Sequence, residues 1–175
     1  MAKRIHDTWC IVAADGSRAR FFTLESPDLP LLEGGPDLVE HGDLVNPDHQ
    51  LKGTERFATQ SGRQRPPGGG LPHTYDDHRT NHMAESETRF ARRLADAVQI
   101  FAESRGAQHL ILSADPRLLG MLRPELSRRL GNALDVRVLA RDVSGLTRPQ
   151  IHAQLSEAGL VPRREPPDVL LESRR

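Results

Sequence analysis

Two β-compatible runs near the N-terminus, joined by a short turn, restrict the fold of this chain more than any other feature. Trp9–Ala14 is continuously apolar, as expected for a strand that is covered on both faces. Asp15-Gly16 follows, and Ala19–Leu24 forms the second run. An Asp-Gly dipeptide between two such runs is typical of a β-hairpin, because glycine tolerates the positive φ that tight turns need. The sequence therefore predicts a sheet that begins with an antiparallel pair, and a weaker third strand is expected within 38–45.

The second half of the chain alternates helical and strand patterns. Apolar residues recur at helical spacing between Ala84 and Arg105. His109–Ala114 then predicts a buried strand, Asp115-Pro116 a helix start, and Val136–Ala140 another strand. Because strand, helix and strand follow with short joins, we expect a right-handed parallel crossover. The fold class is α/β: a mixed β-sheet with an N-terminal hairpin and a parallel βαβ crossover, with helices packed on the sheet.

Two further signals refine this α/β prediction. Pro124 interrupts the leucine stripe of the helix that starts at Pro116, which favours a kink or two short helices. Thr147 and Gln150 form a capping-box pattern for a last helix that ends near Gly159.

Glycine and proline divide the chain into regions. Of its 14 glycines and 13 prolines, 13 residues lie between Gly34 and Pro72. Residues 46–83 show no sustained period, and structureless stretches of this length are usually functional or disordered. We therefore expect one α/β domain over 1–160, with a mobile Gly/Pro-rich excursion at about 46–83, and a loosely held C-terminal tail over 161–175.

Charge and targeting signals exclude several classes of protein. Lys plus Arg and Asp plus Glu each total 24, so overall charge provides no attraction to nucleic acid or to an acidic membrane. Cys10 has no partner for a disulfide within the chain. No stretch approaches the roughly 18 apolar residues of a membrane span, and the run after Lys3-Arg4 is too short for a signal peptide. We expect a cytoplasmic protein without a membrane partner.

Several segments, taken in order, resemble the bacterial host attachment protein family. The likeness extends from Thr8 to Leu155 and rests on Trp9–Phe22, Leu44-Val45-Asn46-Pro47, Leu51-Lys52, Ser61-Gly62-Arg63, Arg89–Ala95 and Ala114–Arg123. Members of that family look cytosolic. The resemblance implies a fold similar to the middle domain of archaeal and eukaryotic class I peptide-chain release factors.

In that release-factor domain, a Gly-Gly-Gln tip precedes a long helix and enters the ribosomal peptidyl-transferase centre. Gly68-Gly69-Gly70 occupies the comparable place here, but Leu71 stands where glutamine would follow. The resemblance therefore implies binding to RNA or the ribosome through a Gly-rich loop, without classical peptidyl-tRNA hydrolysis. We expect no catalytic residues and no cofactor.

The candidate RNA- or partner-binding residues are arginines and glycines. Glycine lets backbone amides approach phosphate closely, and two neighbouring arginines add charge. Other arginines lie near turns and helix starts, where an anion is favoured. The set is Gly68, Gly69, Gly70, Arg63, Arg65, Arg18, Arg20 and Arg117, with Arg123 as a further phosphate candidate. A flexible solvent loop explains the glycines as well as a binding role does, and a solvated surface position is the simpler explanation for each single arginine.

Two other functions remain open from the residues alone. The chain could be a protein-interaction adaptor whose long loop orders on a partner. It could also be a metal-dependent nuclease, since Asp15, Asp115 and Asp142 each follow a predicted strand, although a turn, a helix cap and a loop account for them as well.

Histidine and cysteine offer no clear site. His73, His78 and His82, with Asp76 and Asp77 among them, match no closed structural zinc pattern. Cys10 falls inside a predicted buried strand, where a thiol is inert. The sequence therefore assigns no metal site and no nucleophile.

Overall fold

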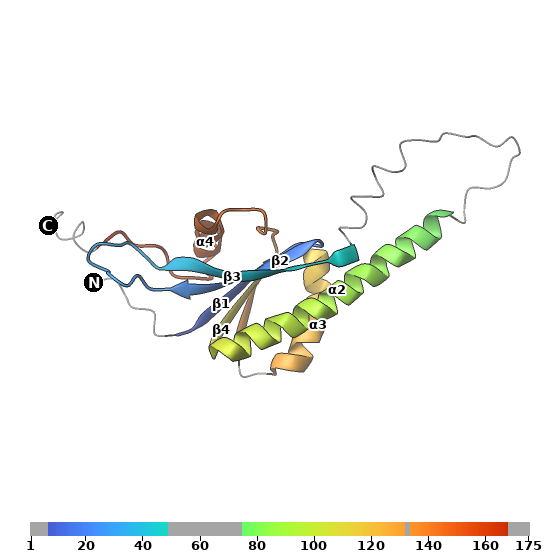
Figure 1. Cartoon of the computed structure of the whole chain (residues 1–175), viewed down its shortest axis with the longest axis horizontal. Helices are drawn as coiled ribbons and strands as arrows, with labels where there is room; N and C mark the ends of the chain where they lie inside the picture. The colour runs from blue at the N-terminus through green and yellow to red at the C-terminus, as the bar shows by residue number, and fades with distance from the viewer. Residues whose placement is uncertain (1–6, 49–74, 132–133, 168–175) are drawn as a thin grey trace, which may run out of the picture.

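A computed structural model describes residues 7–48, 75–131 and 134–167 of the chain. They form one five-stranded mixed sheet in the order β3-β2-β1-β4-β5 (Figure 1). Strands β1, β2 and β3 are antiparallel neighbours, whereas β1, β4 and β5 run parallel. The bounds are β1 (Trp9–Ala14), β2 (Arg18–Glu25), β3 (Asp37–Val45), α2 (Tyr75–Arg105), β4 (His109–Ser113), α3 (Pro116–Leu130), β5 (Asp135–Leu139) and α4 (Arg148–Glu157). The predicted α/β class, hairpin and parallel crossover are confirmed.

Helices cover both faces of the sheet, which explains the continuous apolar run of β1. Helices α2 and α3 lie on one face and α4 on the other (Figure 1). Because successive strand residues point to opposite faces, Cys10 and Val12 pack with α2 and α3, while Ile11 packs with Ile151 of α4. Each face of β1 is therefore part of a hydrophobic core.

Strand β3 pairs with β2 along its whole length but contains a bulge. Phe21 lies opposite Gly42, whereas Phe22 lies opposite Glu40, so His41 is the extra residue. Gly42 has φ of 148°, which only glycine adopts without strain.

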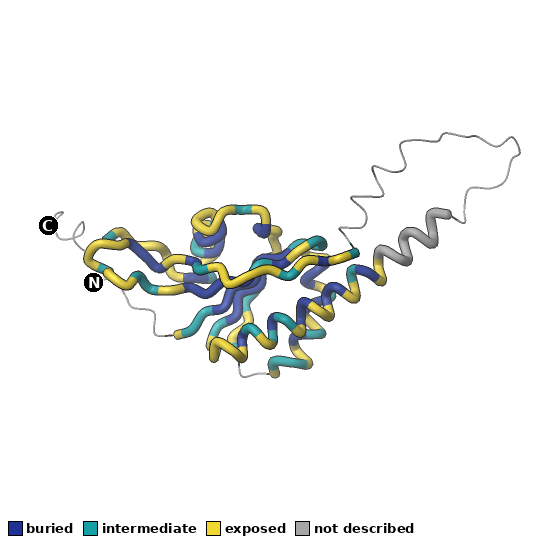
Figure 2. Tube along the Cα trace, viewed as in Figure 1, coloured by how far each residue is buried: buried dark blue, intermediate teal, exposed yellow. Residues whose placement is uncertain are grey.

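Helix α2 begins at Tyr75 rather than at the predicted Ala84. It contains 31 residues, or about 46 Å at 1.5 Å per residue, and its N-terminal part extends beyond the sheet (Figure 1). Within residues 84–105, the side chains of Phe90, Leu94 and Val98 are buried where the helix meets the sheet (Figure 2). An apolar stripe reveals only the part of a helix that packs on a core, which is why the earlier turns escaped prediction.

Helix α3 is one helix through Pro124, so two short helices are not formed. Asp115 caps its start by accepting hydrogen bonds from the N–H groups of Arg117 and Leu118. Buried leucines occur on both sides of the proline, at Leu118, Leu119, Leu122 and Leu126. Both halves of the helix bury leucines in the same core. The free energy gained by this burial exceeds the cost of the backbone hydrogen bond that proline cannot donate.

The last helix has the predicted capping box. The Oε1 of Gln150 accepts hydrogen bonds from the N–H and the hydroxyl of Thr147, at 3.0 and 2.9 Å. No helix within the described ranges is long and apolar enough to cross a membrane.

The first part of the expected C-terminal tail is attached to the domain. Gly35 and Glu165 exchange two backbone hydrogen bonds of 3.0 and 2.6 Å. Arg164 forms an ion pair with Asp37 at 2.9 Å and donates to the carbonyl of Gly34. Arg164 and Glu165 of the expected tail are therefore bonded to the domain, and residues 168–175 lie outside the described residues.

Candidate functional site

The site of interest is the end of the sheet from which α2 projects (Figure 1). The parallel strands β1, β4 and β5 all end here, and β3 ends here before the chain enters residues 49–74. We call the residues that hold this end together the loop base, which consists of Asp15, Ser17, Asn46, Asp48, Arg89 and Ser144.

Asn46 fastens the end of β3 to the β1–β2 turn. The residue is only 2% exposed. Its backbone N–H donates to the carbonyl of Ser17 at 2.7 Å, and its side-chain amide donates to the carbonyl of Gly16 at 2.9 Å. Its Oδ1 accepts from the N–H of Asp48 at 3.2 Å. A buried asparagine with these bonds holds the exit point of the chain in one geometry.

An ion pair joins this exit point to α2. The Nη2 of Arg89 lies 2.9 Å from the Oδ2 of Asp48. Both side chains are accessible to solvent, so water and salt screen the pair and it adds little to stability. Its effect is to connect β3 with the helix to which the chain returns.

Asp15 links the β1–β2 turn to the loop after β5. Its Oδ1 accepts from the N–H and hydroxyl of Ser17 and the N–H of Arg18, at 2.6, 2.5 and 2.9 Å. Its Oδ2 accepts from the hydroxyl of Ser144 at 2.6 Å. Burial raises the pKa of Asp15, but the hydrogen bonds from Ser144, Ser17 and Arg18 outweigh it and hold the pKa below its usual value.

The lowered pKa predicts an acid-dependent loss of stability. The carboxyl of Asp15 binds a proton less readily in the folded protein than in the unfolded chain. Asp15 therefore stabilises the fold fully above about pH 4. This contribution is lost as the pH falls through the pKa that Asp15 has in the folded protein. Asp15→Asn should therefore lower the free energy of unfolding by about 1–2 kcal/mol at neutral pH. The difference from wild type should shrink below about pH 4.

Urea unfolding at a series of pH values measures this dependence. Asp28→Asn is the control, because Asp28 is an exposed carboxylate in the connection between β2 and β3. Equal pH profiles for the two variants would contradict a stabilising role for Asp15.

The sequence predicted that Arg18 and Arg20 bind RNA or a partner. In the structure, their guanidinium groups donate hydrogen bonds to acceptors within the protein. Arg18 donates to the carbonyl of Ser144 at 3.1 Å. Arg20 forms a two-pronged ion pair with Glu40 at 2.7 and 2.8 Å, and its Nη1 donates to the carbonyls of Ser144 and Leu146 at 2.9 and 2.7 Å. The two arginines thus hold the β5–α4 loop against β2.

Arg117 lies at the same end of the sheet, and most of its side chain is exposed. Its side chain is 68% exposed. Its Nη2 lies 2.7 Å from the Oε2 of Glu87 on α2, in a contact without hydrogen-bond alignment. The other predicted residues, Arg63, Arg65, Gly68, Gly69 and Gly70, lie outside the described residues.

The three aspartates considered for a metal have other roles. Since β1, β4 and β5 are parallel, Asp15, Asp115 and Asp142 do follow strands that end at the same edge of the sheet. Asp115 caps α3, however, while Asp15 and Asp142 both accept hydrogen bonds from Ser144. No group of three or more potential ligands occurs in the described part of the chain.

The histidines and the cysteine add no site that the structure describes. His78 and His82 belong to the N-terminal part of α2, whereas His73 lies outside the described residues. Burial raises the pKa of the Cys10 thiol to about 11, with partial opposition from the charge of Arg105. The thiol is therefore protonated at neutral pH.

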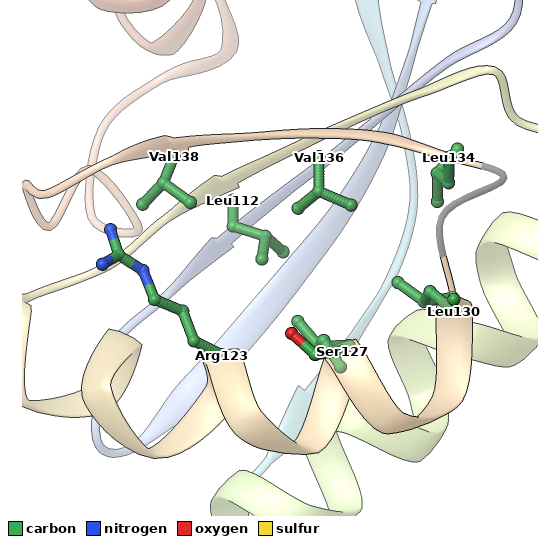
Figure 3. A pocket seen from close by; sticks show the side chains of 9 residues that line it. Leu112, Arg123, Ser127, Leu130, Leu134, Val136 and Val138 are labelled. Atoms are coloured by element: carbon green, nitrogen blue, oxygen red, sulfur yellow. The ribbon is translucent and has the colours of Figure 1, made fainter.

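Sequence reasoning missed a cavity of about 310 Å³ between α3 and β5. Figure 3 shows Val136 and Val138 along one side and Leu130 on the other. Arg123 and Ser127 are its polar residues. Its walls come from segments that are separate in the chain. The alternation of valines in β5 was the one feature of the sequence that pointed to an apolar surface here.

Comparisons with known proteins identify a family and a distant structural likeness. A family model described as "Protein required for attachment to host cells" matches residues 10–155. Among solved structures, the type II variant of the Ppx/GppA phosphatase of Aquifex aeolicus is similar, with a TM-score of 0.37 and 8% sequence identity. The match covers 75% of this chain and 36% of the phosphatase. A sequence search of curated proteins found no match. The likeness to release factors stays a prediction.

Proposed function

The chain belongs to the family of proteins required for attachment to host cells, and from this premise we propose that it is a binding protein that contacts RNA, in particular on the ribosome, through its Gly-rich loop. In this proposal it does not carry out classical peptidyl-tRNA hydrolysis, because Leu71 follows the three glycines where the release-factor tip has glutamine.

The observation that carries the proposal is the construction of the loop base. Asn46 is buried and bonded on three sides, and Asp48 is paired to α2, so the chain enters residues 49–74 from a fixed point. The segment ends at Tyr75, the first residue of a helix that extends beyond the sheet (Figure 1). A rigid scaffold that carries a functional loop is a common arrangement in binding proteins.

The contacts at this end of the sheet narrow the set of RNA-binding residues. Arg18 and Arg20 already bond to carbonyls and to Glu40 within the fold. Arg63 and Arg65 precede the glycine run, and the side chain of Arg117 is 68% exposed, with only its Nη2 in contact with Glu87. We therefore assign phosphate contact to Arg63, Arg65 and Arg117, and a supporting role to Arg18 and Arg20.

Co-sedimentation of the full chain with purified bacterial ribosomes tests the proposal. Wild type should pellet with ribosomes at low salt and be released as salt rises. Deletion of 66–71 should abolish the association. Arg63→Gln with Arg65→Gln should weaken it and reduce the slope of log K against log salt by roughly 0.7–0.9 for each phosphate that the variant no longer neutralises.

The control removes the same charge elsewhere. Arg93→Gln with Arg163→Gln changes two exposed arginines in α2 and beyond α4, and it should leave the association unchanged. Circular dichroism must show native folding in every variant. Absence of association, or association that the deletion leaves intact, overturns the proposal, and binding that resists ribonuclease supports the adaptor function instead.

A further inference from the structure

Strand β5 forms one edge of the sheet, and its outer backbone groups are unpaired within the described residues. The N–H of Asp135 donates to Gln108, and the carbonyl of Leu139 accepts from Ala114, so both point toward β4. Because backbone groups alternate along a strand, the N–H and C=O of Val136 and Val138 point away from the sheet. These groups are available to another strand.

β5 contains no lysine and no proline, and its two charged side chains have opposite signs and pair with each other. Natural edge strands usually carry lysine, proline or a bulge to prevent pairing. β5 has the sequence Asp-Val-Arg-Val-Leu, and its pairing with β4 is regular. Val136 is 39% exposed, and Figure 3 shows it with Val138 along one side of the cavity.

We propose that β5 pairs antiparallel with β5 of a second copy of this chain, about a twofold axis at Val136, so that the two sheets become one. In this register Val136 faces Val136 of the second copy as a hydrogen-bonded pair, which its outward N–H and C=O allow. Val138 faces Leu134 on the same side of the sheet. The valines that line the two cavities then lie next to each other across the interface.

Charge complementarity favours a second copy over an unrelated partner. The same register places Asp135 opposite Arg137 of the other copy, and Arg137 opposite Asp135. Within one chain these two side chains lie on the same face, with Arg137 Nη2 2.7 Å from Asp135 Oδ2. Opposite charges directly across two strands stabilise their pairing, whereas like charges oppose it. The hydrogen-bonding groups, apolar side chains and charges of β5 are thus all complementary to those of a second β5. Such self-complementarity is what an isologous dimer requires.

Sedimentation-velocity ultracentrifugation of the full chain over a concentration series tests the dimer. Wild type should approach twice the monomer mass of 19.5 kDa as concentration rises. Val136→Lys should remain monomeric. Ile100→Lys is the matched control, because Ile100 is 67% exposed on α2, and this variant should associate as wild type does.

A charge exchange tests the register independently of Val136. Arg137→Asp and Asp135→Arg should each raise the dimer dissociation constant by about tenfold or more, since each places like charges opposite each other. An equimolar mixture of these two variants should dimerise again, because every cross-strand pair then has opposite charges. A monomeric wild type, a dimer that survives Val136→Lys, or a mixture that fails to recover overturns the proposal, and circular dichroism checks that each variant is folded.

Discussion

Truncation of Phe90 to alanine is expected to lower the free energy of unfolding by about 3–5 kcal/mol. The side chain is 2% exposed and is part of the core between α2, α3 and the sheet. Its removal forfeits the transfer free energy of the ring and leaves a cavity that close-packed neighbours fill only in part. Phe90 is the largest of the buried α2 side chains in this core, so its neighbours in the helix cannot replace its contacts.

Urea denaturation followed by circular dichroism measures this loss. Ile100→Ala is the control, because it truncates an exposed apolar residue of the same helix and should change stability by less than about 0.5 kcal/mol. Similar losses for the two variants would show that α2 does not pack as described.

Replacement of Arg20 by methionine should cost about 2–3 kcal/mol of stability. The change leaves Glu40 without its two-pronged partner, and it removes the donors that bind the carbonyls of Ser144 and Leu146. Methionine keeps much of the apolar stem, so the loss reports mainly on these polar interactions. Arg20→Lys should lose less, because it keeps the charge but not the planar fork.

Equilibrium urea unfolding of both variants measures these losses. Arg92→Met is a suitable control: Arg92 is 63% exposed and lies 3.7 Å from Glu125, which keeps Arg128 and Arg129 as partners, so its loss should cost much less than the loss of Arg20. If Arg20→Met were as stable as wild type, Arg20 would be free to act in binding, as the sequence alone suggested. If stability falls as expected, any loss of ribosome association in that variant reflects the fold, and Arg63 and Arg65 remain the direct test.

Local patterns predicted most elements of the fold because their causes are local. The apolar run of β1, the Asp-Gly turn, the Asp115-Pro116 helix start and the Thr147–Gln150 capping box all act within a few residues. The start of α2 was missed because the sequence of its first turns, residues 75–83, has no apolar stripe. The continuity of α3 through Pro124 was missed because buried leucines on both sides decide it.

The candidate site was predicted less well, because its interactions join distant parts of the chain. Asp15 bonds to Ser144, Arg20 to Leu146, and Asp48 to Arg89. An arginine in the sequence looks the same whether it binds phosphate or holds a loop. Only the position of its acceptors distinguishes the two roles.

By itself, the sequence determined the α/β class, the hairpin, the crossover and membership in the attachment family, because apolar periodicity, turn residues and family motifs are written along the chain. Only the tertiary structure decided that Arg18 and Arg20 support the β5–α4 loop, that Asn46 fastens the loop base, and that β5 is an edge strand. These features depend on strand order and on hydrogen bonds between residues far apart in the chain. No local pattern encodes which of those residues become neighbours.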